Sequence, residues 1–169
     1  MCSSDLVRNA PAIDALAASL GSRSIDLLLL NAGLHLQKDC TLETLDGPLW
    51  LEEMQVNVVA PIMVARRFAP LVARSVHKRI VAMSSSLGSI AMVRNGGNQA
   101  YRSGKAALNA ALRILSFDLA GEGITVAAIA PGLTRTDMGG PAALYSPEDS
   151  VANVRRTVAD RKSTRLNSS

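Results

Sequence analysis

Residues 25–33 read Ile-Asp-Leu-Leu-Leu-Leu-Asn-Ala-Gly, a short apolar run that ends abruptly in small and polar residues. A continuous apolar run of this length, without the alternation of a half-exposed strand, is typical of a strand buried on both faces of a parallel sheet. Asn31, Ala32 and Gly33 then end the strand and begin a loop. We therefore expect a buried strand over residues 25–30, with a turn directly after it.

Two more runs of this kind follow along the chain. Residues 80–83 form an apolar run that opens into Ser84-Ser85-Ser86-Leu87-Gly88, and residues 124–130 form another that is broken by Pro131-Gly132. Each run therefore ends in polar or glycine residues. In parallel sheets, ligands bind beyond the carboxyl ends of the strands, so these residues lie where a site is expected.

Helical patterns separate the three runs. Apolar residues recur at helical spacing over residues 10–20, and longer helices are predicted over residues 49–76 and 98–120. Pro61 and Pro70 should kink or punctuate the helix over 49–76, because proline removes a backbone donor. A last helix should begin at Ser146-Pro147, with serine as its cap. Strands that alternate with long helices predict parallel βαβ units and the α/β class.

The composition is that of one packed domain. The chain has 169 residues, 48% of them hydrophobic and 19% charged, with a mean hydropathy of +0.18, which excludes disorder as its overall state. Aromatic residues make up only 3%, so nucleic-acid binding by base stacking lacks its usual platforms. The net charge is +4, and Lys162 and Arg165 near the end of the chain supply two of those charges. We predict no nucleic-acid partner.

The cysteine content and the lack of targeting signals indicate the cellular compartment of the protein. Cys2 and Cys40 form no Cys-x-x-Cys pair and have no neighbouring histidine, which argues against a disulfide framework or a zinc site. The chain lacks the basic start and apolar run of a signal peptide, and no apolar stretch approaches the ~18 residues needed to span a bilayer. We predict a cytoplasmic protein without a metal site or a membrane partner.

Tyr101 and Lys105 are the first candidates for chemistry. They lie four residues apart on one predicted helix, so they share a face, and a nearby ammonium should lower the pKa of the phenol. A tyrosine tuned in this way can exchange a proton with a substrate oxygen near neutral pH. Alone the pair is weak evidence, because this spacing occurs by chance in many helices.

The neighbouring polar residues each have two interpretations. A hydroxyl among Ser84, Ser85 and Ser86 could hydrogen-bond a substrate carbonyl held against Tyr101, or the three could form a solvated loop. Asn57 could anchor the site behind Lys105, or it could face solvent or cap a kink.

The sequence motifs of other kinds of site are incomplete or absent. His35 and His77 have no spacing to another ligand and are expected at the surface. The sequence around Gly104-Lys105 lacks the remaining residues of a phosphate loop, and no Gly-x-Ser-x-Gly elbow supports a hydrolase.

Five motifs in order resemble the short-chain dehydrogenase/reductase family over residues 7–160. They are Asn31-Ala32-Gly33, Asn57, Ser84-Ser85-Ser86-Leu87-Gly88, Tyr101-x-x-x-Lys105 and Pro131-Gly132-x-x-x-Thr136. The resemblance implies a Rossmann-like, doubly wound parallel sheet. It also implies an oxidoreductase that transfers hydride between NAD or NADP and a carbonyl or alcohol substrate, and that forms a homodimer or homotetramer in its full-length form.

The resemblance assigns a role to each motif. Tyr101 would be the general acid/base, Lys105 would lower its pKa and bind the nicotinamide ribose, Ser85 would steady the substrate carbonyl, and Asn57 would hold a water of the proton relay. Ser84 and Ser86 are alternatives for the serine. The remaining cofactor-binding residues would be Asn31, Ala32, Gly33, Pro131, Gly132 and Thr136.

The chain departs from the family pattern at both ends. No glycine-rich Thr-Gly-x-x-x-Gly-x-Gly turn is present, so the first βαβ unit has no counterpart and only the family strands 4-5-6 are expected. We expect an incomplete domain over 7–161, flanked by non-native, adapter-like segments at 1–6 and 162–169. Residues 27–30 should then form an unpaired, aggregation-prone edge, and the isolated chain should be inactive. The alternative is a Rossmann-like remnant that associates without catalysis.

Overall fold

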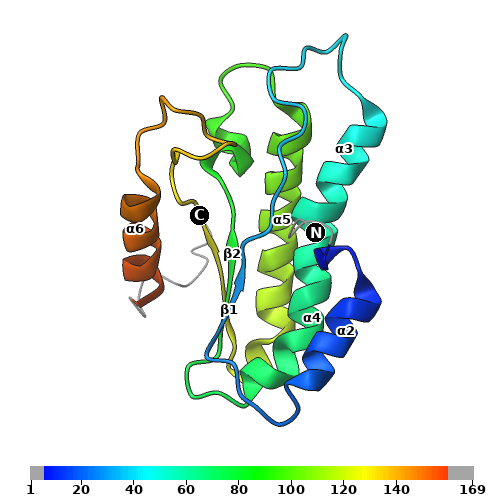
Figure 1. The fold of residues 1–169 in the computed structure, drawn as a ribbon, viewed down its shortest axis with the longest axis vertical. Coiled ribbons are helices and arrows are strands. Elements are labelled where there is room, and N and C mark those ends of the chain that lie inside the picture. Colours follow the sequence, from blue (N-terminus) through cyan, green and yellow to red (C-terminus); the bar gives the residue numbers. More distant parts are fainter. Residues whose placement is uncertain (1–5, 160–169) are drawn as a thin grey trace.

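A three-stranded parallel sheet forms the centre of the computed structural model, which describes residues 6–159 (Figure 1). The strands are β1 (Leu27–Leu30), β2 (Arg79–Met83) and β3 (Thr125–Ile129), in the spatial order β1-β2-β3. The predicted α/β class and the parallel arrangement are confirmed. Residues 1–5 and 160–169, which include nearly all of both predicted non-native segments, lie outside the described residues.

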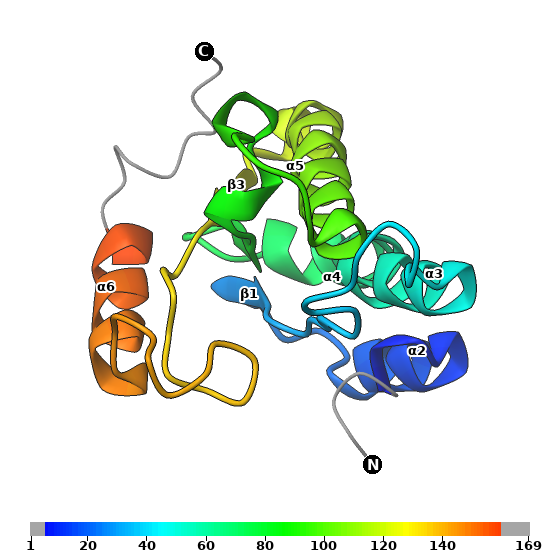
Figure 2. The same ribbon diagram turned by 90° about the horizontal axis from the view of Figure 1, so that it is seen from above.

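Helices cover both faces of the sheet (Figures 1 and 2). On one side, α4 (Ala60–Ala73) packs against β1 and β2, and α5 (Gln99–Asp118) packs against β3. On the same side, α2 (Ala10–Ser19) packs on α4, and α3 (Gly47–Met54) packs on α5. The other face carries α6 (Pro147–Ala159). This two-sided covering is the predicted doubly wound architecture.

The two faces hold cores of different size. The larger core lies between the sheet and helices α4 and α5, where Val72, Ile80 and Leu112 are fully buried. The smaller core joins α6 to the sheet through Val158, Val81 and Ile129. Neighbouring side chains of β2 therefore point into different cores. Both cores need apolar residues, so apolar and polar residues do not alternate along this strand.

Strand β1 differs from the prediction of a strand buried on both faces. Leu28 and Leu30 pack in the larger core, but Leu27 and Leu29 are 39% and 45% exposed. The reason is that α6 packs on residues of β2 and β3, so that among the described residues the outer half of this face has no cover. Within residues 6–159 the outer edge of β1 is also unpaired, as predicted.

The predicted helix over residues 49–76 is interrupted by a π-turn. Helix α3 continues through η1 (Gln55–Val59) into α4, and the Ala60 N–H donates to the carbonyl of Gln55, five residues back. Pro61 follows at once; it has no N–H for the carbonyl of Asn57, and its ring would collide with that carbonyl in a regular helix. The wider turn avoids the collision, so Pro61 punctuates the helix as predicted, whereas Pro70 lies inside α4.

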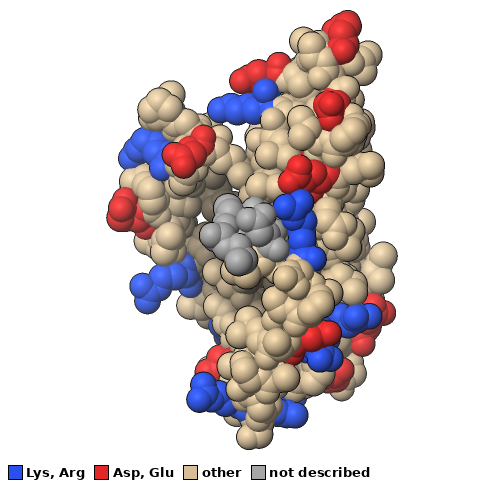
Figure 3. Space-filling model, turned by 45° about the vertical axis from the view of Figure 1, so that its right-hand side comes forward, with Lys and Arg blue, Asp and Glu red and all other residues tan. Residues whose placement is uncertain are grey.

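The helix that spans Gly47–Ala73 also meets the length and apolarity of a membrane span, contrary to the sequence prediction. Half of its most apolar window is buried inside the protein, and α4 packs on the sheet, as a core helix does. On the face drawn in Figure 3, basic and acidic side chains are interspersed.

Helix α6 begins as the sequence predicted. Ser146 Oγ accepts a hydrogen bond from the Asp149 N–H at 3.0 Å and donates to Asp149 Oδ2 at 2.8 Å, which makes Ser146 the cap.

Truncation of Leu112 should destabilise the larger core. We expect Leu112→Ala to lower the free energy of unfolding by about 2–5 kcal/mol, because it removes fully buried methyl groups from α5 and leaves a cavity. Ile114→Ala, on the same helix but 62% exposed, is the matched control and should change it by less than about 1 kcal/mol. Urea unfolding followed by circular dichroism measures both; equal effects would contradict this account of the core.

Candidate active site

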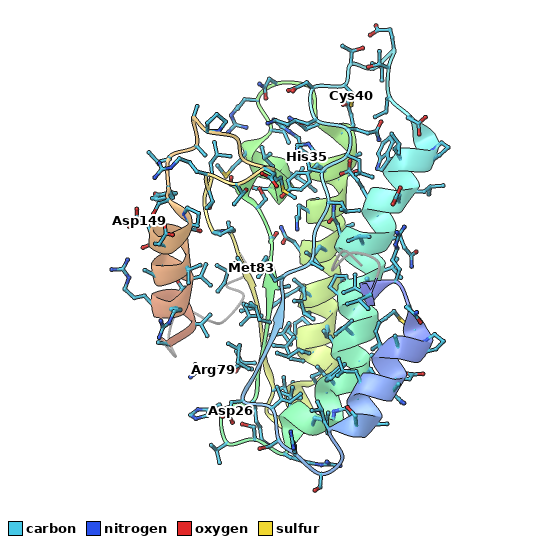
Figure 4. All side chains as sticks on the ribbon, viewed as in Figure 1. Asp26, His35, Cys40, Arg79, Met83 and Asp149 are labelled. Carbon is cyan, nitrogen blue, oxygen red and sulfur yellow. The ribbon has the colours of Figure 1, made fainter. Side chains whose placement is uncertain are left out.

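The site lies beyond the carboxyl ends of the three strands, which meet at one edge because the strands are parallel. Figure 4 shows which end of the sheet this is. Asp26 and Arg79 mark the opposite end, Met83 ends β2, and His35 lies beyond Met83. Asn31, Ser84 and Pro131 each follow closely after one of the strands. The structure thus brings the starts of the three predicted loops together at the same edge of the sheet.

Tyr101 and Lys105 lie in the first two turns of α5 and are buried, at 9% and 4% exposure. Lys105 Nζ donates a hydrogen bond to the carbonyl of Met83 at 2.8 Å and lies 5.6 Å from the centre of the Tyr101 ring. The ammonium is therefore bound to the end of β2 and is near the phenol, as the four-residue spacing predicted.

The pKa of Tyr101 is raised above its ordinary value, whereas the sequence predicted a lowered one. Burial is the largest cause of the increase, and the negative charge of Glu53 adds to it. The hydrogen bond from the Ser85 hydroxyl acts in the opposite direction without cancelling them. The prediction was wrong because it counted one neighbouring cation and could not include the burial of the ring.

Burial lowers the pKa of Lys105, whereas it raises the pKa of Tyr101. Removal of the ammonium from water lowers its pKa to about 8, since burial disfavours the charged form. Lys105 is therefore mostly protonated at neutral pH and loses its proton in mildly alkaline solution.

Asn57 lies in the π-turn and is 1% exposed. Its Oδ1 accepts from the Leu34 N–H and its Nδ2 donates to the Leu34 carbonyl, both at 2.8 Å. A Cβ on Gly33 would lie 3.4 Å from Asn57 Oδ1 and 3.7 Å from Lys105 Nζ, so Asn57, Gly33 and Lys105 are close neighbours. Asn57 anchors the loop after β1 beside Lys105 and neither faces solvent nor caps a helix end.

The three serines after β2 have different surroundings. Ser84 is buried and donates to Asn109 Oδ1 at 2.6 Å, and Ser86 is exposed. Ser85 is half-buried, accepts from the Leu87 N–H at 3.2 Å and hydrogen-bonds to Tyr101. Of the three, Ser85 is thus the serine that faces the phenol.

The predicted cofactor residues lie on two loops at this edge. Asn31 is exposed, and Ala32 and Gly33 are half-buried after β1. After β3, Pro131 is half-buried, and its carbonyl accepts from the Ser150 Oγ of α6 at 3.1 Å, which ties this loop to α6 rather than to α5. Gly132 and Thr136 of the same loop are exposed, and Gly132 has a φ of +83°.

Tyr145 explains why residue 132 is glycine. A Cβ at this position would lie 2.6 Å from the Tyr145 ring, so the ring packs directly on the glycine backbone. Any larger residue would both clash with Tyr145 and occupy a strained conformation.

Two further residues of the site were missed by the sequence analysis. The His35 ring stacks on the Tyr101 ring with centroids 4.4 Å apart, so the prediction of an isolated surface histidine was wrong. Glu53 is fully buried, and its Oε1 accepts from the Leu36 and Gln37 N–H groups at 2.8 and 3.0 Å. The available signal was spacing: Glu53 precedes Asn57 by four residues on one predicted helix.

Comparison with known proteins agrees with this geometry. The sequence model of the short chain dehydrogenase family matches residues 4–144. The chain belongs to this family. It is 34% identical to C-signal of Myxococcus xanthus over 144 residues, which is 85% of this chain and 86% of that protein. It is 35% identical to the rhamnolipid-biosynthesis 3-oxoacyl-acyl-carrier-protein reductase of Pseudomonas aeruginosa, over 80% of this chain and 56% of that one.

Solved structures give the same family. The carbonyl reductase Sniffer of D. melanogaster superposes with a TM-score of 0.88 at 32% identity, over 94% of this chain and 70% of that chain. A short-chain dehydrogenase/reductase from Burkholderia multivorans with bound NADP gives 0.84 at 33%, over 94% and 68%. The chain spans only about half the length of several other curated relatives that it matches, for example 45% of an oxidoreductase from Schizosaccharomyces pombe.

Lys105 should make the stability depend on pH. Between about pH 8 and its ordinary value of 10.5, the unfolded chain holds a proton on this lysine that the folded chain has lost. The free energy of unfolding should therefore rise from pH 8 to pH 10, by on the order of 2–3 kcal/mol from this group. Above pH 10 the raised pKa of Tyr101 opposes the rise, because the unfolded chain then loses a phenol proton that the folded chain keeps.

Urea titrations at pH 8, 9 and 10 measure this slope. Lys105→Met should flatten it, even though the variant also loses the bond to Met83 and with it some stability at every pH. Lys38→Met, at an exposed lysine, should keep the slope. An unchanged slope in Lys105→Met would show that another group titrates in this range.

Proposed function

We propose that this chain carries the proton-transfer site of an NAD- or NADP-dependent carbonyl reductase. The observation that supports it best is the joint placement of Ser85, Tyr101 and Lys105, with two hydroxyls facing each other and an ammonium behind the phenol ring. The Burkholderia multivorans relative holds bound NADP, and a carbonyl reductase from chicken fatty liver holds bound NADPH, at 33% and 27% identity to this chain. The solved relatives also include the carbonyl reductase Sniffer.

The residues perform complementary steps in this proposal. Ser85 donates a hydrogen bond to the substrate carbonyl oxygen, and Tyr101 donates its proton to that oxygen as negative charge develops on it. The raised pKa keeps the phenol protonated at neutral pH, which suits reduction of a carbonyl. The protonated Lys105 then favours the phenolate that remains. When bound, the nicotinamide supplies the hydride to the carbonyl carbon.

The site fits one end of a dinucleotide. Lys105 and Tyr101 offer a cation and a hydroxyl for the nicotinamide ribose, and Asn31 and Thr136 are exposed at the same sheet edge. For the pyrophosphate, the sequence contains no Thr-Gly-x-x-x-Gly-x-Gly turn, whose backbone N–H groups would bind phosphate at the start of a helix. We therefore propose that the isolated chain neither binds the cofactor tightly nor turns over.

Cofactor binding by the purified chain tests this directly. Isothermal titration with NADH and NADPH should show no saturable binding with a Kd below about 100 µM, since the phosphates lack their usual donors. A monodisperse protein with a Kd in the low micromolar range would contradict the proposal.

The catalytic proposal is tested in a chimera that supplies the family strands expected before β1. The segment of the NADP-bound Burkholderia multivorans relative that precedes the counterpart of Val7 would be joined to residues 7–169. In this chimera we expect Tyr101→Phe to lower kcat by at least about 100-fold, because the proton donor is lost. Tyr145→Phe, at the only other tyrosine, keeps its ring on Gly132 and should remain active.

Cofactor consumption with a panel of ketones and aldehydes measures this activity. If the chimera binds NADPH but reduces no carbonyl in the panel, or if Tyr101→Phe is as active as the unmodified chimera, the proposed reaction is wrong.

A second candidate is association without catalysis. Two large apolar side chains of α5, Ile114 and Phe117, are 62% and 64% exposed and could pack against a second copy of the chain. Sedimentation experiments show whether the chain dimerises. If Tyr101→Phe abolishes the reductase activity of the chimera but leaves dimerisation unchanged, the activity and the association are separate properties.

A further inference from the structure

The imidazole of His35 covers one face of the Tyr101 ring. The two rings are nearly parallel, with an interplanar angle of 27° and 4.4 Å between their centroids. His35 Nε2 also lies 3.0 Å from Asn98 Oδ1, in a hydrogen bond across 63 residues of sequence. Asn98 directly precedes α5, the helix that carries Tyr101. His35 therefore contacts both the phenol ring and the beginning of its helix.

The loop that carries His35 is fixed on both sides by buried side chains. Asn57 binds the N–H and the carbonyl of Leu34, immediately before His35. Glu53 accepts from the N–H groups of Leu36 and Gln37, immediately after it. Glu53 and Asn57 are four residues apart and are both buried, so one face of a continuous helical run holds the loop at two points. Such anchoring restricts where the imidazole can lie.

We propose that His35 is a positioning residue for Tyr101, which holds the phenol in one orientation and keeps water from one face of its ring. This proposal rests on the proposed function, in which Tyr101 is the proton donor. Small displacements of a catalytic group can lower a rate by orders of magnitude, so a residue that fixes the ring contributes to turnover without touching substrate.

The groups that act on the phenol come from four elements. Lys105 is on the same helix, Glu53 is on α3, the Ser85 hydroxyl follows β2, and His35 is on the loop after β1. Burial is the largest of the effects that raise the pKa of Tyr101. Loss of the His35 ring should therefore expose the phenol to water and move its pKa back toward the ordinary value of about 10.

The test uses the 169-residue chain and needs no turnover. The sequence contains two tyrosines, so labelling with tyrosine that carries ¹³C at Cζ gives two resonances, and Tyr101→Phe assigns them. The pH titration of Tyr101 and the ring-current shift of its ring protons are then measured in each variant. Circular dichroism on the same samples excludes points at which the protein has begun to unfold.

His35→Ala should lower the titration midpoint of Tyr101 and abolish the ring-current shift. His35→Phe retains a ring over the phenol but loses the hydrogen bond to Asn98, so it should keep most of the raised midpoint and part of the ring-current shift. His77→Ala removes the only other histidine, which is exposed, and should change neither. In the chimera, His35→Ala should lower kcat about tenfold or more although its phenol is more acidic, and His35→Phe should restore much of it.

Glu53→Gln separates charge from position. The amide oxygen can still accept from Leu36 and Gln37, so the ring-current shift should remain, whereas the loss of the negative charge should lower the titration midpoint. If His35→Ala does not fold, Asn98→Gly removes the acceptor of His35 at a residue whose φ of +55° suits glycine, and it should weaken the ring-current shift.

The proposal is overturned if the midpoint and the ring protons of Tyr101 are the same in His35→Ala, or in its substitute Asn98→Gly, as in the unmodified chain. A chimera that reduces no carbonyl while the resonances respond as expected would overturn the proposed function and leave the contact between His35 and Tyr101 intact. The two failures are therefore distinguishable.

Discussion

The pair of hydrogen bonds between Asn57 and the backbone of Leu34 is the constraint on which the site depends. A buried amide without a hydrogen-bond partner lowers the stability of the folded state by about 1–3 kcal/mol. The Asn57 side chain and the Leu34 backbone avoid this cost by bonding to each other. Once Leu34 is fixed, Gly33 lies against Lys105 and His35 lies against Tyr101. One side chain thus sets the distance between the sheet edge and the helix that carries the phenol.

The fold could be predicted from the sequence to a large extent. Strands of a parallel sheet are contiguous apolar runs, and their bounds are visible because Gly33, Ser84 and Pro131 interrupt the runs. The exposure of Leu29 could not be predicted, because it depends on how much of the sheet α6 covers and not on the composition of β1. The π-turn was also invisible, although Pro61 marked the correct place for an irregularity.

The site was predictable where its residues are close in sequence. Tyr101 and Lys105 share a helix, and residues 84–86 are serines directly after a strand, so spacing and strand ends indicated them, and the family resemblance singled out Ser85. The direction of the Tyr101 pKa shift was wrong because burial and the charge of Glu53 arise from tertiary structure. His35 was missed for the same reason: its partner Asn98 is 63 residues away, and no local pattern connects them.

The π-turn gives the helix between residues 47 and 73 one residue more than a regular α-helix would need at that point. Deletion of a single residue from Gln55–Val59 would close the wide turn into a regular α-helix, in which the Pro61 ring collides with the carbonyl four residues before it. Asn57 lies within this turn, so its closure would also displace the side chain that binds the backbone of Leu34. The number of residues in this helix, and not only their chemical identity, is therefore a requirement of the site.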